Sequence, residues 1–78
     1  MTSIMLRTSE LKLGAMSKII EISAEPIIRE RLLELGLAPG RQLKVLRALP
    51  FSGPIIVQSG SLTLVLRREE AEQIWVEA

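Results

Sequence analysis

The chain of 78 residues contains no histidine and no cysteine, and its 10 basic and 9 acidic side chains nearly balance. This composition excludes disulfides and the usual zinc sites, so the 47% of residues that are hydrophobic must stabilise the fold by packing. The near-neutral charge disfavours nucleic-acid binding, and no apolar run approaches the ~18–20 residues of a membrane-spanning helix. We therefore expect one small domain over residues 1–78, cytoplasmic, not membrane-embedded and not bound to nucleic acid.

The first half of the chain predicts a strand followed by a helix. We expect residues 1–8 to be frayed, and the alternation over residues 16–23 predicts a strand with Met16, Lys18, Ile20 and Ile22 on one face. Pro26 suits the first position of a helix, where its missing N–H costs nothing. This helix should run to residue 35, with an apolar stripe that plugs one end of the core and consists of Ile28, Leu32 and Leu35.

Two turns are predicted directly after this helix, in the segment LGLAPG at residues 35–40. Gly36 suits a left-handed helix cap, which allows Leu37 to fold back onto Leu32. Residues 38–41 match a type II turn, with Pro39 at the second position and Gly40 at the third. These residues are interpreted as a structural motif that sets the angle at which the chain leaves the helix.

The second half of the chain predicts short strands joined by tight turns. The expected strands are residues 42–48, 55–57, 62–66 and a last one around residues 74–76, with a helical turn at residues 68–72. Gly60 lies in the predicted hairpin turn and completes the structural motif residues. The fold class expected is therefore mainly β, a small five-stranded barrel with one α-helix inserted after the first strand and a short helical turn before the last.

Three segments resemble the ferrous iron transport protein A (FeoA) family: RLLELGLAPG at 31–40, QLKVLRALP at 42–50 and GSLTLVLRREEAEQIWV at 60–76. The resemblance covers nearly the whole chain and implies an SH3-like barrel. It also implies a cytoplasmic accessory protein of ferrous iron uptake that contacts the GTPase-containing permease FeoB. The chain departs from the family pattern at residues 52–54, where the acidic residue that commonly precedes proline is absent, and at Ser61, where tyrosine is common.

A partner surface is predicted at two places that proline and glycine make rigid. The first is the helix exit, with Leu37, Pro39 and Arg41, and the second is the loop with Pro50 and Phe51. Exposed aromatic residues are enriched in protein interfaces, although Phe51 can equally cover an open end of the barrel. For Trp75, packing against the N-terminal segment is the favoured interpretation.

No enzyme is expected, because without histidine or cysteine a general base at neutral pH would have to be a shifted carboxylate or lysine. No cofactor is expected to be required. The acidic residues Glu69, Glu70 and Glu72 adjoin two arginines and are interpreted as a solvated turn, although carboxylates permit a weak association with ferrous iron or manganese.

Two other interpretations stay open. SH3-like domains also form the C-terminal part of iron- or manganese-dependent repressors, so the resemblance allows a free-standing, metal-responsive regulatory module. The chain's short edge strands and Phe51 permit homo-oligomers. The second of these interpretations, a nucleic-acid-binding barrel, would need more positive charge than this chain has.

Overall fold

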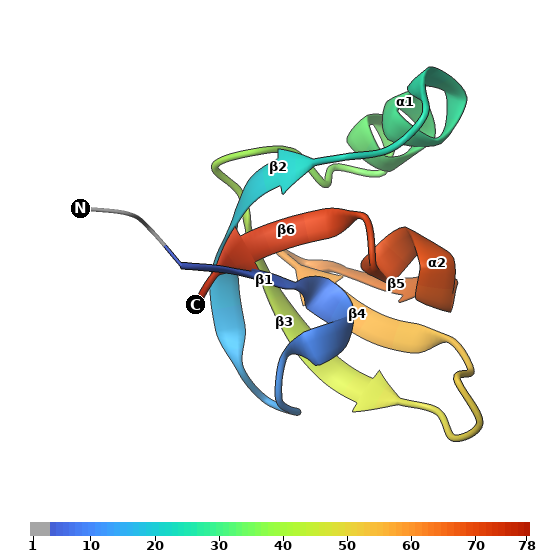
Figure 1. The fold of residues 1–78 in the computed structure, drawn as a ribbon. Coiled ribbons are helices and arrows are strands. Elements are labelled where there is room, and N and C mark those ends of the chain that lie inside the picture. The colour runs from blue at the N-terminus through green and yellow to red at the C-terminus, as the bar shows by residue number, and fades with distance from the viewer. Residues whose placement is uncertain (1–3) are drawn as a thin grey trace.

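The computed structural model describes residues 4–78, which form six antiparallel strands and two α-helices (Figure 1). The strands are β1 (Met5–Arg7), β2 (Met16–Ile22), β3 (Gln42–Ala48), β4 (Ile55–Ser59), β5 (Leu62–Leu66) and β6 (Ile74–Glu77). The helices are α1 (Pro26–Glu34) and α2 (Arg68–Ala71), and a 3-10 helix follows β1 at Thr8–Glu10. Within residues 4–78, no helix is long and apolar enough to cross a membrane.

The strands form one sheet in the order β1-β6-β2-β3-β4-β5. Strands β1 and β5 lie at the two ends of this order, and among the described residues no pairing joins them. The prediction of a closed, five-stranded barrel is therefore wrong in strand number and in closure. Alternation along the chain indicates which residues form strands, whereas closure depends on tilt and stagger between strands that are distant in sequence.

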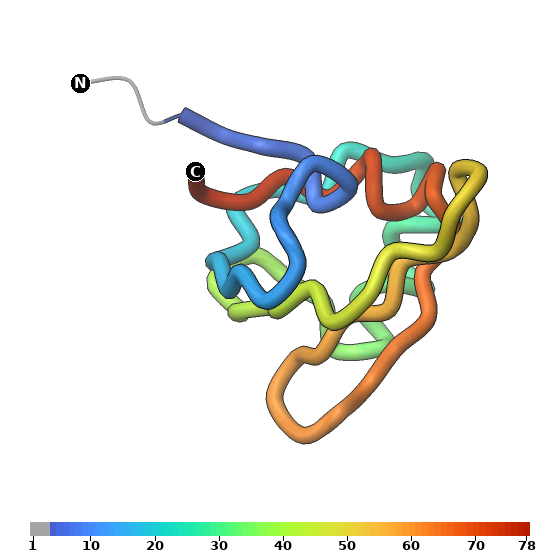
Figure 2. Tube along the Cα trace, turned by 90° about the horizontal axis from the view of Figure 1, so that it is seen from below, coloured from blue at the N-terminus to red at the C-terminus, as the bar shows by residue number. Residues whose placement is uncertain are grey.

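The additional strand, β1, lies in the segment predicted to fray, residues 1–8. Its residues pair with β6, and Figure 2 shows the blue N-terminal segment running beside the red C-terminal strand. Directly after β1, the side chain of Thr8 is fully buried, and its hydroxyl donates a hydrogen bond to the carbonyl of Ile74 at 3.0 Å. Residues 1–3 of the predicted frayed segment lie outside the described residues.

Trp75 packs against the N-terminal segment, as the favoured interpretation predicts. The residue is partly buried and lies opposite Arg7 in the pairing of β6 with β1. The guanidinium carbon of Arg7 lies 5.1 Å from the centroid of the Trp75 ring, within the range of a cation–π contact. Trp75 therefore helps to hold β1 on the sheet.

Strand β2 has the predicted position, but of its predicted inward face, which consisted of Met16, Lys18, Ile20 and Ile22, only Ile22 is buried. The buried residues of β2 are Ile19 and Ile22. The pairing of β2 with β6 shifts register between Ile19 and Glu21, and such a bulge reverses the alternation of the side chains. Lys18, directly before the buried Ile19, faces solvent, where its ammonium lies 3.7 Å from a carboxylate oxygen of Glu77.

The core contains side chains from strands β2 to β6, both helices and the turn after α1. Its buried residues are Ile19, Ile22, Leu32, Leu37, Leu43, Val45, Ile55, Val57, Leu66, Ala71, Ile74 and Val76. From the predicted helix stripe, Leu32 is fully buried and Ile28 packs against the core, whereas Leu35 is exposed. Helix α1 therefore contacts the core with one side and projects beyond the strands at the upper right of Figure 1.

The cap predicted at the end of α1 is present. Gly36 has φ +94°, and its N–H donates a hydrogen bond to the carbonyl of Leu33 at 3.0 Å. The N–H of Leu37 donates to the carbonyl of Leu32, also at 3.0 Å. This pair of bonds defines a Schellman cap, and it turns the Leu37 side chain into the core beside Leu32.

The type II turn predicted after this cap is also present and is attached to β2. Gly40 has φ +92°, and the N–H of Arg41 donates to the carbonyl of Ala38 at 3.0 Å. The N–H of Gly40 donates to the carbonyl of Ile19 at 2.8 Å, and the N–H of Ile19 donates to the carbonyl of Arg41 at 2.7 Å. Cap and turn together join α1 to the sheet.

Replacing Gly36 by valine should lower the free energy of unfolding by about 1–2 kcal/mol, because a β-branched residue is strained at positive φ. A Cβ at this position would meet no atom within 4 Å, so the cost comes from the backbone alone. Chemical denaturation of Gly36→Val beside Gly36→Asn measures it, since asparagine tolerates this backbone better. Equal stability of the valine variant and the unmodified chain would contradict the cap.

Candidate functional site

A tight turn of unusual composition connects β3 and β4. The N–H of Gly53 donates to the carbonyl of Pro50 at 3.1 Å, and the two central residues, Phe51 and Ser52, have φ values of +60° and +55°. Positive φ at both central positions defines a type I′ turn, which strongly favours Asn-Gly, Asp-Gly or Gly-Gly at these positions. A type I′ turn matches the twist of the hairpin strands. Phe51 and Ser52 are nevertheless strained at its positive φ values.

Phe51 is 99% exposed and gains nothing from burial. The alternative that Phe51 covers an open end of the barrel is therefore wrong. A residue other than glycine in the left-handed region costs roughly 1–2 kcal/mol, and such strain clusters at functional sites. An exposed aromatic side chain on a strained turn is therefore a candidate contact for a partner protein, as the sequence predicted for Pro50 and Phe51. We call residues 50–53 the hairpin tip.

The helix exit, the other half of the predicted partner surface, divides into buried and exposed residues. Pro39 and Arg41 are exposed, but Leu37 is fully buried. The prediction that Leu37 contacts a partner is wrong, because the Schellman cap directs this side chain into the core.

The structure does not bring the hairpin tip and the helix exit together. Arg41 directly precedes β3 and Pro50 follows it, so the 7 residues of that strand lie between them. At about 3.3 Å per residue, a strand of this length spans roughly 20 Å. The two places predicted as one surface are therefore two separate surfaces at opposite ends of β3.

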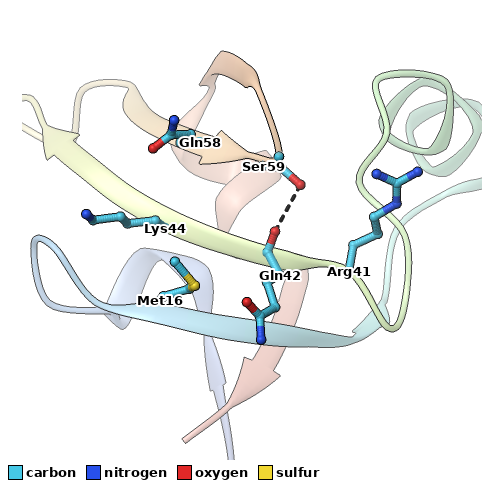
Figure 3. A pocket seen from close by; sticks show the side chains of 7 residues that line it. Met16, Arg41, Gln42, Lys44, Gln58 and Ser59 are labelled. Atoms are coloured by element: carbon cyan, nitrogen blue, oxygen red, sulfur yellow. Dashed lines mark hydrogen bonds between the residues drawn. The ribbon is translucent and has the colours of Figure 1, made fainter.

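Arg41 instead lines an open groove on the sheet. The groove has a volume of about 480 Å³ and is lined by Met16, Arg41, Gln42, Lys44, Gln58, Ser59 and Gly60. The hydroxyl of Ser59 donates to the carbonyl of Gln42 at 2.9 Å and joins β3 to β4 (Figure 3). In this view Arg41 and Lys44 lie at opposite ends of the groove and point in different directions, so their charges do not converge. Of these lining residues, only Arg41 is predicted from the sequence to contact a partner, whereas Gly60 is predicted in a turn and Met16 on an inward strand face. Outward polar side chains on strands resemble any solvated face.

The acidic cluster predicted as a solvated turn contains one buried carboxylate. Glu70 accepts a hydrogen bond from the backbone N–H of Arg67 at 2.8 Å and another from the Arg31 guanidinium at 2.6 Å. Its side chain is 7% exposed, so the interpretation as a solvated turn is wrong for Glu70. The carboxylate caps α2 and ties it to α1. Within residues 4–78, no three acidic side chains converge as a metal site would require.

Nearly the whole chain matches one protein family. The family model described as the FeoA domain matches residues 7–78. A curated relative, the Fe(2+) transport protein A/Fe(2+) transporter FeoB fusion protein of Porphyromonas gingivalis (strain ATCC BAA-308 / W83), is 32% identical over 72 residues. The match covers 92% of this chain but only 8% of that protein, so the chain corresponds to a small part of the fusion protein.

Solved structures share the fold. The FeoA protein of Chlorobium tepidum is 44% identical with a TM-score of 0.86, over 92% of this chain and 69% of that one. A manganese-dependent transcriptional repressor is 27% identical with a TM-score of 0.90, over 99% of this chain and 43% of that one. Stenotrophomonas maltophilia FeoA complexed with zinc, described as a prokaryotic SH3 domain protein, is 29% identical with a TM-score of 0.75, over 91% and 88%. The expected SH3-like fold is thus confirmed, with six strands in an open order.

Proposed function

Because the chain belongs to the FeoA domain family, which is linked to ferrous iron transport, we propose that it is an accessory protein of ferrous iron uptake that contacts the permease FeoB. The observation that supports this most directly is the relative in which transport protein A and the FeoB transporter form one chain. Joining two modules in one chain raises their effective concentration toward each other. Such fusion is therefore useful where the separate modules work in contact.

The hairpin tip is the surface we assign to this contact. Its Pro50 and Phe51 present apolar area in a turn whose backbone is already fixed, so little conformational entropy is lost on binding. An aromatic anchor of this kind fits an apolar pocket on the partner. The protein acts in this proposal by contact at the cytoplasmic part of FeoB and performs no covalent step itself.

The hairpin tip also makes the proposal testable without damage to the fold. Replacing Phe51 by asparagine relieves the positive-φ strain, so Phe51→Asn should unfold at the same or a higher denaturant concentration than the unmodified chain. Its affinity for the cytoplasmic domain of FeoB should nevertheless fall about 10-fold or more, because an exposed aromatic anchor is lost. Titration calorimetry, with the permease domain nucleotide-free, GDP-bound and GTP-bound, measures the affinity.

The matched control is Ile27→Ala, which removes a second exposed apolar side chain, on α1 and far along the chain from the tip. This variant should bind FeoB as the unmodified chain does. The absence of binding in all nucleotide states would overturn the proposed function. Equal affinity of Phe51→Asn and the unmodified chain would move the contact away from the hairpin tip.

A second candidate function is supported by the similarity to the manganese-dependent repressor, of which the chain matches 43%. In this alternative the chain is a free-standing regulatory module that associates with ferrous iron or manganese. Calorimetry with each ion, under anaerobic conditions for ferrous iron, distinguishes the two functions. A tight, stoichiometric signal would support the metal-responsive module, and the absence of a signal would reject it.

A further inference from the structure

Strand β5 lies at an open edge of the sheet and contains no charged residue and no proline. Its sequence LTLVL pairs with β4 on one side only, within the part of the chain that the structure describes. Leu62 and Thr63 are exposed, and Val65 is 67% exposed. Natural proteins usually protect such an edge with lysine, proline or a bulge, because free backbone groups pair with other strands. The uncharged edge of β5 therefore favours pairing with another β-strand.

The turn between β4 and β5 determines which backbone groups of β5 are free. Ser59 lies opposite Leu62 across a two-residue turn whose first residue, Gly60, has φ +62°. In such a hairpin the flanking pair exchanges both of its backbone hydrogen bonds, and these bonded pairs then alternate along the strands. The N–H and C=O groups of Thr63 and Val65 consequently point away from β4. Within residues 4–78, neither residue forms a backbone hydrogen bond to a turn or loop.

From this pattern we infer that β5 pairs antiparallel with β5 of a second copy of the chain. A two-fold axis that passes between the Leu64 residues of the two copies places Thr63 of each copy opposite Val65 of the other. Both residues have outward backbone groups, so this register uses the free N–H and C=O of both and leaves none unpaired. The interface is isologous, the commonest arrangement in homodimers.

The side chains of β5 fit this two-fold register as well. Leu62 lies opposite Leu66 of the other copy, which is buried in its own core, and Arg67 lies opposite an uncharged serine, Ser61, so no like charges meet. The strand has a similar pattern in both directions, which favours a second copy over an unrelated charged segment. In Figure 2 the orange β4–β5 hairpin projects from the rest of the molecule, where a second copy can approach it. This dimer does not depend on the contact with FeoB.

Sedimentation velocity across concentration tests the dimer. The interface is small, so we expect the unmodified chain to shift from monomer to dimer between about 10 µM and 1 mM. The double variant Thr63→Lys and Val65→Lys should stay monomeric at 1 mM, because lysine then opposes lysine. Both positions are exposed, and thermal unfolding followed by circular dichroism shows that each variant is folded.

A charge swap tests the register. The double variant Thr63→Glu and Val65→Lys places glutamate opposite lysine in the register centred on Leu64 and should restore the dimer. In registers that pair residue 63 or residue 65 with itself, the same variant would oppose like charges and stay monomeric. Amide hydrogen exchange supplies an independent measure, because protection of Thr63 and Val65, but not of Leu64, should increase with concentration.

A chain that is monomeric at 1 mM, or a Lys-Lys variant that dimerises like the unmodified chain, would overturn the inference. A Glu-Lys variant that stays monomeric while the unmodified chain dimerises would overturn the register centred on Leu64.

Discussion

Leu37→Ala is expected to lower the free energy of unfolding by about 2–5 kcal/mol, the range for truncating a buried leucine. Leu37 is fully buried in the core beside Leu32, and its backbone N–H closes the cap of α1. The substitution removes buried apolar surface and leaves a cavity that the surrounding strands fill only in part. Because domains of this size are stable by only about 5–15 kcal/mol, this loss is large.

Leu33→Ala is the matched control, since it removes the same atoms from a residue in the same segment that is 41% exposed. We expect a loss below about 1 kcal/mol for it, because alanine is also the better helix former. Urea denaturation of both variants gives the comparison. If Leu37→Ala were as stable as Leu33→Ala and only FeoB binding were lost, Leu37 would be a partner contact after all.

Glu70→Ala is expected to cost about 1–3 kcal/mol, because it removes two hydrogen bonds to a buried carboxylate. The backbone N–H of Arg67 loses the acceptor that caps α2, and Arg31 on α1 loses its ion-pair partner. Arg31 is 54% exposed, so solvent weakens the ion pair, and most of the loss should come from the cap. Denaturation of Glu70→Ala beside Glu69→Ala, an exposed neighbour in the same turn, measures the effect.

A double-mutant cycle separates the two contributions of Glu70. Arg31→Met keeps the apolar part of the side chain and should cost only about 0–1 kcal/mol, the range for exposed ion pairs. In the double variant the two costs should fall short of adding by about that amount. Full additivity would show that the 2.6 Å contact between Arg31 and Glu70 adds nothing to stability.

Local patterns were sufficient for much of the fold. The cap at Gly36 and the type II turn at residues 38–41 follow from backbone preferences of glycine and proline, which act within a few residues. The positions of β3, β5 and α1 follow from alternation and helical periodicity in the same way. The resemblance to the FeoA family rests on these same segments, and the FeoA domain model matches residues 7–78.

The predictions that the structure contradicts concern places where segments distant in the sequence pack together. Strand β1 has only 3 residues, too few for a periodic pattern, and it forms because β6 offers it a partner. The bulge in β2 depends on its pairing with residues 74–76, so an unbroken alternation along β2 places only Ile22 correctly on the inward face. The burial of Glu70 likewise depends on Arg31, which lies 39 positions away in the chain.

The candidate site shows the same division. The sequence alone identified Phe51 as a candidate contact in a proline- and glycine-rich loop, because local composition predicts such loops. Only the tertiary structure showed that its side chain is 99% exposed on a type I′ turn, that Leu37 is buried, and that β3 separates the tip from Arg41. The sequence determined the cap at Gly36, the turn at residues 38–41, most of the strands and the family, because these depend on neighbouring residues. Exposure, sheet closure and the free edge of β5 depend on contacts across the chain, and only the fold decides them.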